Sequence, residues 1–161
     1  MNKIPIPTIF ILTFAMLILA PMTGDAGSKS FPKAPWSVHY EDGSANGYRF
    51  HRDSESDDAH FQYSPVQPKD SSTGMYSGGE PANGVMKPKQ VEELWKRILK
   101  LESDAKLRAE ARIKGTGAFH IKESTLNRDF IIVAGPELDS WNKFLSAFRR
   151  GKQGLISPRI E

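Results

Sequence analysis

Three histidines in the first half of the chain are the residues whose type best suits metal chemistry. His39, His51 and His60 each fall in a short segment where aromatic and polar residues alternate. If these segments pair as strands with their aromatic residues in the core, period-two alternation directs all three imidazoles to the opposite face. Imidazole and carboxylate are the usual zinc ligands in a chain without cysteine, and the acidic segment 52–59 follows nearby. The spacing matches no established zinc motif, so scattered surface histidines are the alternative.

The second candidate site is a long segment that would bind a partner rather than catalyse a reaction. Residues 64–84 are rich in proline, glycine and serine, and loops of this length inside a compact domain are often binding loops. Within it, Tyr76 stands beside Ser77, Gly78 and Gly79, where an aromatic anchor could be presented to another protein. A solvated connection held down by Tyr76 is the alternative, and residues 75–86 could also close a small hairpin.

The third candidate site is a basic surface. Residues 27–86 hold 5 Lys and Arg against 8 Asp and Glu, whereas residues 87–161 hold 16 against 10. One interpretation is that Arg108, Arg112 and Lys114 form a basic strand face that binds an anionic partner. The alternative is that the acidic loops of the first half fold against the basic strands of the second half. Nucleic acid is not the expected partner, because the net charge is only +3 and no aromatic residues interleave the basic ones.

Catalytic motifs are missing or fail on inspection. The acidic run that begins at Asp53 resembles a calcium loop, but Asp58 stands where a glycine is needed and Ser64 where a bidentate Glu should close the site. Residues 103–106 match S-x-x-K without the other motifs of penicillin-binding enzymes, and neither a nucleophile elbow nor a phosphate loop occurs. The sequence therefore favours a non-catalytic protein and, apart from the metal alternative, indicates no cofactor.

Two helices with one apolar stripe each are expected to hold these sites in place. Residues 88–102 carry apolar side chains at helical spacing, and Pro88 suits the first helical position. A second helix is predicted from Pro136 to Arg150, where an acidic residue follows the proline and two arginines close the last turn.

Short strands make up the rest of the predicted fold. Segments 36–40 and 48–51 alternate around a turn and should form a hairpin, with 60–63 as a third strand. Segments 107–114 and 119–122 also alternate and read as a second hairpin, and the nearly continuous apolar run 129–133 is typical of a central strand covered on both faces. The predicted fold class is α+β, with an antiparallel sheet or sheets of short strands packed by two amphipathic helices.

The N-terminus has the pattern of an export signal. A positive residue, an apolar stretch and a small-x-small site that ends at Ala26 predict a signal peptide over residues 1–26, with an uncleaved anchor as the alternative. The chain has no cysteine, and exported eukaryotic domains of this size usually carry disulfides. We therefore expect a bacterial protein of the periplasm or medium, with no stable membrane span after cleavage.

These observations lead to one reading with two alternatives. A lead-in at 27–35, a single domain at 36–151 and a tail at 152–161 are expected to follow the signal. The expected function is that of an exported, non-catalytic interaction protein, such as an inhibitor or accessory of another extracytoplasmic protein. The alternatives are a small metal-binding protein or metal-dependent enzyme that uses the three histidines, and an envelope-structural protein that binds anionic polymers.

Overall fold

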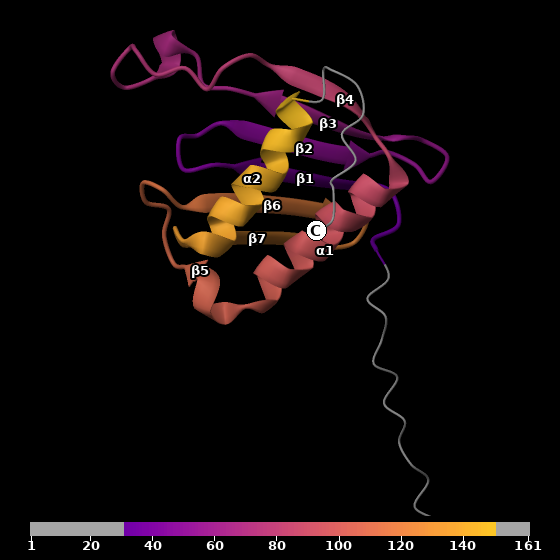
Figure 1. The fold of residues 1–161 in the computed structure, drawn as a ribbon. Coiled ribbons are helices and arrows are strands. Elements are labelled where there is room, and N and C mark those ends of the chain that lie inside the picture. The colour runs from indigo at the N-terminus through magenta and orange to yellow at the C-terminus, as the bar shows by residue number, and fades with distance from the viewer. Residues whose placement is uncertain (1–30, 151–161) are drawn as a thin grey trace, which may run out of the picture. The chain divides into compact units, whose positions relative to one another are not determined.

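A seven-stranded antiparallel sheet covered on one face by two helices forms the described part of the chain (Figure 1). The structure is a computed structural model and describes residues 31–150. The signal peptide and the tail that the sequence predicts lie outside these residues, as do residues 27–30 of the lead-in. The predicted α+β class is confirmed, with all strands in one sheet.

The first four strands form a meander, and the chain then crosses to the other half of the sheet. The strand order is β4-β3-β2-β1-β6-β7-β5. The strands of the meander are β1 (Trp36–Glu41), β2 (Gly47–Arg52), β3 (Ala59–Ser64) and β4 (Ala82–Met86). After helix α1 (Pro88–Ser103), the second half holds β5 (Arg108–Ala109), β6 (Gly117–Glu123) and β7 (Asn127–Ile132), followed by helix α2 (Pro136–Arg150). Two short 3₁₀ helices, Pro68–Asp70 and Ala105–Leu107, complete the elements.

The core lies between the helices and one face of the sheet. Each of the first three strands sends alternate aromatic residues inward, and Tyr40 and Phe50 are completely buried. Trp95 on α1 meets Trp36 edge to face, with ring centroids 5.3 Å apart, and Trp141 on α2 meets Tyr40 in the same manner at 5.6 Å. Each such side chain contributes on the order of 2 kcal/mol through burial, so the helices are fixed on this face.

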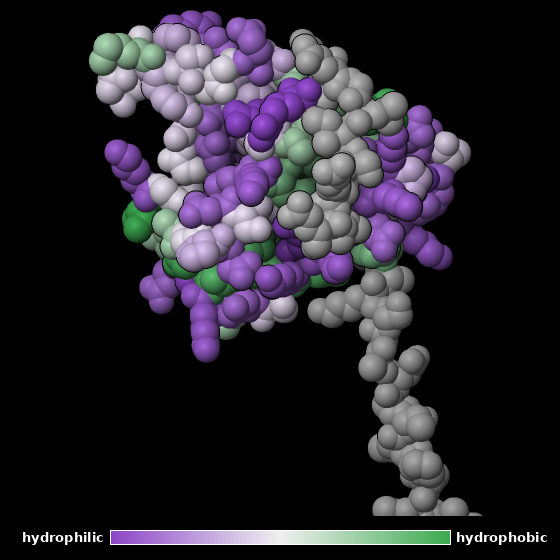
Figure 2. All heavy atoms as spheres, viewed as in Figure 1, coloured by the Kyte–Doolittle hydropathy of each residue, from purple (hydrophilic) through white to green (hydrophobic). Residues whose placement is uncertain are grey.

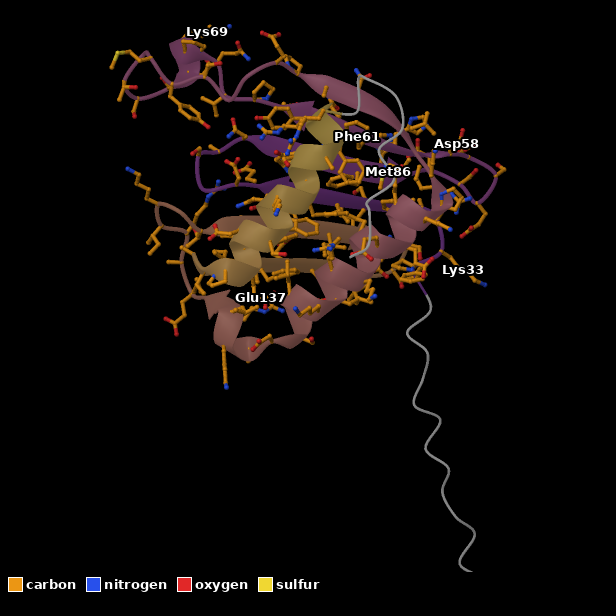
Figure 3. The ribbon with its side chains drawn as sticks, in the orientation of Figure 1. Lys33, Asp58, Phe61, Lys69, Met86 and Glu137 are labelled. Carbon is orange, nitrogen blue, oxygen red and sulfur yellow. The ribbon has the colours of Figure 1, made fainter. Side chains whose placement is uncertain are left out.

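The helices pack their apolar stripes against the core, and their outward faces are largely polar. From the helix side the surface is mostly hydrophilic (Figure 2). The Lys100 ammonium pairs with the carboxylate of Glu137 at 3.1 Å, which links α1 to the first turn of α2. Figure 3 labels Glu137. Within residues 31–150, no helix is both long and apolar enough to cross a bilayer.

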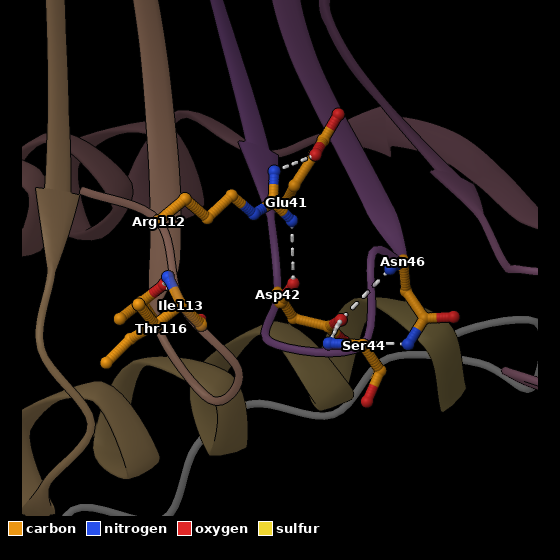
Figure 4. Close-up of polar contacts among 7 residues, drawn as sticks. All are labelled: Glu41, Asp42, Ser44, Asn46, Arg112, Ile113 and Thr116. Carbon is orange, nitrogen blue, oxygen red and sulfur yellow. Dashed lines mark hydrogen bonds and ion pairs between the residues drawn. The ribbon is translucent and has the colours of Figure 1, made fainter. Parts of the chain in front are cut away.

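The predicted strand 107–114 is wrong for most of its length. Only Arg108–Ala109 form a strand, and they pair with β7 instead of with 119–122. The alternating residues at 109 and 111 are alanines, which bury too little surface to hold a strand, and Ile113 is left 69% exposed. Residues 110–116 instead turn across the end of the sheet, where the Thr116 hydroxyl donates to the Ile113 carbonyl at 2.7 Å (Figure 4).

Two further strand predictions need correction. The run 129–133 was expected to be covered on both faces, but β7 buries only Phe130 and Ile132 while Asp129 is exposed on the other face. The small hairpin within 75–86 does not form, because β4 pairs along its whole length with β3.

Candidate functional site

The face of the sheet opposite the helices holds every histidine of the chain. The side chains of His39, His51, His60 and His120 all point away from the core, since the residue before each of them is buried. The strand register arranges them in two cross-strand pairs, with His51 opposite His60 and His39 opposite His120. This face therefore contains the predicted histidines together with a fourth one.

The pair on the β4 side lies beside an open hollow. The rings of His51 and His60 are stacked, with centroids 5.5 Å apart and planes at 24°. A hollow of ≈ 550 Å³ opens next to them, and Asp53 and Val85 contribute to its lining. The His51 Nδ1 atom is buried without a hydrogen-bond partner among residues 31–150, so this ring has an unused polar atom beneath the hollow.

The second pair lies nearer the centre of the sheet. The rings of His39 and His120 have centroids 6.0 Å apart, and Arg49 is opposite His39 on its other side. The His120 Nδ1 atom is 3.0 Å from an Asp129 carboxylate oxygen, which fixes the orientation of the ring. Burial lowers the pKa of His39, and the nearby cations, including His120 and Arg49, lower it further.

The structure separates the three histidines that were predicted to bind a metal. His51 and His60 form one pair, whereas His39 belongs to the other. Within residues 31–150, no group of three or more histidine, aspartate or glutamate side chains is arranged to hold a metal ion. Metal binding by these histidines stays an untested prediction.

The predicted binding loop is held at its base by hydrogen bonds to the buried side chain of Asn46. Asn46 is only 3% exposed, and its amide nitrogen donates to the Tyr76 hydroxyl and to an Asp42 carboxylate oxygen, both at 2.8 Å. Its amide oxygen accepts a hydrogen bond from the Val66 backbone N–H at 3.0 Å. One side chain therefore contacts both the beginning of the loop, at Val66, and its later part, at Tyr76. Figure 4 shows the turn that supports Asn46.

Tyr76 and Gly78 therefore have a structural role in addition to the predicted one. The Gly78 carbonyl accepts a hydrogen bond from the Tyr63 hydroxyl at 2.7 Å, and its N–H donates to the Val66 carbonyl at 2.9 Å. Ser77 and Gly79 are exposed beside these anchored residues. The rest of the loop projects away from the sheet, as the position of Lys69 shows (Figure 3), and Met75 is 83% exposed. Whether residues 76–79 contact a partner is a prediction still.

The predicted basic strand face is divided by internal contacts. The Arg108 guanidinium lies 4.2 Å from the Phe130 ring centroid and donates to the Glu102 carbonyl at 2.6 Å. Arg112 forms an ion pair with Glu41 and donates to the Asp42 carbonyl at 3.1 Å (Figure 4). The hydrogen bond that Arg112 donates to the Glu41 carboxylate lowers the pKa of Glu41. Of the three predicted residues, only Lys114 has no hydrogen bond or ion pair within residues 31–150.

The two edges of the sheet differ in length and protection. On one edge, β5 has two residues and begins with an arginine. On the other, β4 has the five residues Ala-Asn-Gly-Val-Met, without a charge or a proline, and Val85 is 57% exposed. Natural sheets usually protect their edges with short strands, charges or prolines, so β4 is the unprotected edge.

Comparisons with protein-family models, with curated proteins and with solved structures give no match.

Sequence reasoning missed three features of this site. His120 and Arg49 were not grouped with His39, because that grouping depends on the pairing of β1 with β6. The role of Asn46 was also missed, because an asparagine before a glycine is typical of any turn. The neutral edge strand was visible only as a short apolar pair at Val85 and Met86.

Proposed function

We propose that this protein is a non-catalytic binding protein that acts outside the cytoplasm and binds another protein along β4. The observation that carries this proposal is the unprotected β4 edge. The extracytoplasmic setting rests on the signal-like sequence of residues 1–26. The partner would be another extracytoplasmic protein, for which this chain serves as an inhibitor or an accessory.

The β4 edge supports binding by strand addition. All five residues of β4 pair with β3 on one side, and no strand of residues 31–150 lies on the other side. An extended segment of a partner can therefore use the outward N–H and C=O groups of β4, while its side chains meet Asn83 and Val85. Main-chain hydrogen bonds would supply affinity, and the hollow beside Val85 would supply selectivity.

The anchored loop supports the same surface. The loop 65–81 leads directly into β4, so Met75 and Val85 are exposed apolar residues on two consecutive segments. Because Asn46 holds the base of the loop through two of its residues, binding would require little further ordering there. This arrangement suits a surface that is formed before the partner arrives.

The polar contacts favour binding over catalysis. Within residues 31–150, the one side-chain hydrogen bond of a histidine joins His120 to Asp129. In this part of the chain, no serine, threonine or lysine is hydrogen-bonded to a histidine that could act as a base.

Site-specific crosslinking of the exported protein tests the proposal. A photoreactive residue at position 83 should capture one protein repeatedly, whereas the same residue at Lys143 on α2 should not. Val85→Lys places a charge on the edge and should abolish capture, while Val85→Thr keeps the branched shape and should retain it. Equal capture from positions 83 and 143, or capture unchanged by Val85→Lys, would reject β4 as the binding edge. Capture of a second copy of this chain would identify the partner as itself.

A further inference from the structure

The uncovered sheet face concentrates cations around His39. In the register, Gln62, Arg49, His39, His120 and Asp129 form one continuous cross-strand row. Lys122 lies in the next row on β6, opposite Ser37, and so is a diagonal neighbour of His39. Three adjacent strands, β2, β1 and β6, thus each place basic or titratable side chains on the same small area.

The acidic groups in this area already have polar partners. Glu41 is engaged by Arg112, and Asp129 lies 3.0 Å from His120. Arg49 and Lys122, in contrast, form no hydrogen bond or ion pair with any residue of 31–150 through their side chains. With neutral imidazoles, Arg49, Lys122 and Arg112 outnumber Glu41 and Asp129 by one charge. Protonation of His39 and His120 raises this excess to three.

The surroundings of His39 show the same imbalance. The charged groups that face it are Glu41 on its own strand, Arg49 on β2, His120 on β6 and Arg112 from the loop 110–116. Only Glu41 favours the protonated ring, and the other three oppose it together with burial. An anion placed here would therefore stabilise the imidazolium, and by linkage protonation of the ring would strengthen anion binding.

We propose that His39, Arg49, His120 and Lys122 form a binding site for oxyanions of the phosphate or sulfate type, and that its affinity rises as the imidazoles become protonated. Guanidinium is planar and matches the paired oxygens of such groups, and an imidazolium adds two N–H donors. Asp129 assists by fixing the His120 ring, which leaves Nε2 available for the ligand. The anion can be free or carried on a polymer, because an open sheet face accepts either.

This site is separate from the surface proposed for protein binding. It lies on β2, β1 and β6 in the middle of the sheet, whereas protein binding was assigned to β4 at the edge. The two proposals can therefore fail independently, since Val85→Lys leaves all four oxyanion-binding residues in place.

Histidine side-chain NMR of the purified protein provides the test, with sulfate as the probe. Sulfate keeps its charge between about pH 5.5 and pH 8, so a change in affinity over this range reports on the protein. At constant ionic strength set with chloride, sulfate should shift the His39 and His120 signals at pH 5.5 more than those of His51 and His60. The affinity should fall about tenfold at pH 8, because the charge-assisted hydrogen bonds of the imidazoles are lost.

Matched charge variants decide between a site and general attraction. Arg49→Gln and Lys122→Gln should each weaken binding about tenfold, whereas Lys89→Gln and Lys143→Gln remove exposed helix lysines and should change it less than twofold. Equal shifts of all four histidines, equal effects of all four variants, or no shift at pH 5.5 would overturn the proposal. Titrations with inorganic phosphate and with polyphosphate, at equal phosphate concentration, then show whether the bound oxyanion is free or part of a polymer. Binding of both indicates a free anion, and binding of polyphosphate alone indicates a polymer.

Discussion

The Asn46 amide donates a hydrogen bond to the Tyr76 hydroxyl at 2.8 Å, and this contact joins the β1–β2 turn to a loop thirty residues further along the chain. Asn46 is in turn fixed by Asp42, whose carboxylate accepts from both its backbone and its side-chain nitrogen. The buried side chain of Asn46 and the Tyr63 hydroxyl thus together hold the base of the longest loop of the domain against the sheet. The loop is consequently an extension of the β1–β2 turn rather than an independent segment.

Asn46→Ala should release the base of the loop. The substitution leaves the Val66 N–H without its acceptor and removes the two hydrogen bonds that the Asn46 side chain donates to Asp42 and Tyr76, so we expect the free energy of unfolding to fall by about 2–4 kcal/mol. Denaturant unfolding measures this loss, and amide exchange at Val66 should accelerate. Tyr76→Phe removes one of these bonds and should cost about 1 kcal/mol. Unchanged exchange at Val66 in Asn46→Ala would contradict the assigned role of Asn46.

Gly78→Ala should displace the same loop for a steric reason. A methyl group at Gly78 would lie 1.9 Å from the Asn46 amide oxygen and 2.9 Å from the Pro65 side chain. Because Asn46 cannot move without losing its own hydrogen bonds, we expect a loss of about 2–3 kcal/mol in thermal or denaturant unfolding. Gly74 is the matched control, since it has a φ of 69° but nothing within 4 Å of the added methyl. Gly74→Ala should cost only about 1 kcal/mol of backbone strain, so equal losses would refute the steric explanation.

The sequence allowed the helices and the first three strands to be predicted because each has large apolar residues at a clear period. Leu94, Trp95 and Ile98 fall on one side of a helix, and apolar residues, most of them aromatic, alternate with polar ones along β1 to β3. The strand 107–114 failed because alternation of alanine with charged residues has a period but little apolar surface. A periodic sequence pattern therefore predicts a strand or helix only when the repeated side chains bury enough apolar surface to stabilise it.

The candidate site was harder to predict because it depends on pairing between distant segments. The outward direction of His39, His51 and His60 follows from alternation within each strand. Their division into two pairs follows from the register of β1 with β6, which joins residues about eighty positions apart. No local pattern encodes that register, so the proximity of His120 to His39 and the isolation of the β4 edge required the structure.

Arg128→Ala should reveal a stabilising ion pair between the sheet and α1. The Arg128 guanidinium contacts the Glu102 carboxylate at 2.5 Å and also pairs with Glu123, and all three side chains are about one-fifth exposed. Removal of the cation leaves two largely buried carboxylates together, so we expect the free energy of unfolding, measured with denaturant, to fall by about 2 kcal/mol. Lys100→Ala breaks the exposed pair with Glu137 and should cost less than about 0.5 kcal/mol. A similar small loss for both variants would show that partial burial does not strengthen the Arg128 pairs.

Acidification should destabilise the protein in two separate steps. The pKa of His39 is lowered from 6.5 in the fold, chiefly by burial, so the unfolded chain binds the proton more readily. Stability should therefore decline as pH falls below about 6.5, and His39→Gln should flatten this first decline. The pKa of Glu41 is lowered from 4.5, chiefly by the hydrogen bond that its carboxylate accepts from Arg112. The stabilisation that the ionised Glu41 gives to the fold is therefore present above about pH 4.5 and is lost at lower pH. Denaturant unfolding at a series of pH values measures both steps. Glu41→Gln should abolish the second step and also deepen the first, because the Glu41 carboxylate favours protonation of His39. If His39→Gln follows the unsubstituted protein between about pH 7 and pH 5, another group must cause the first decline.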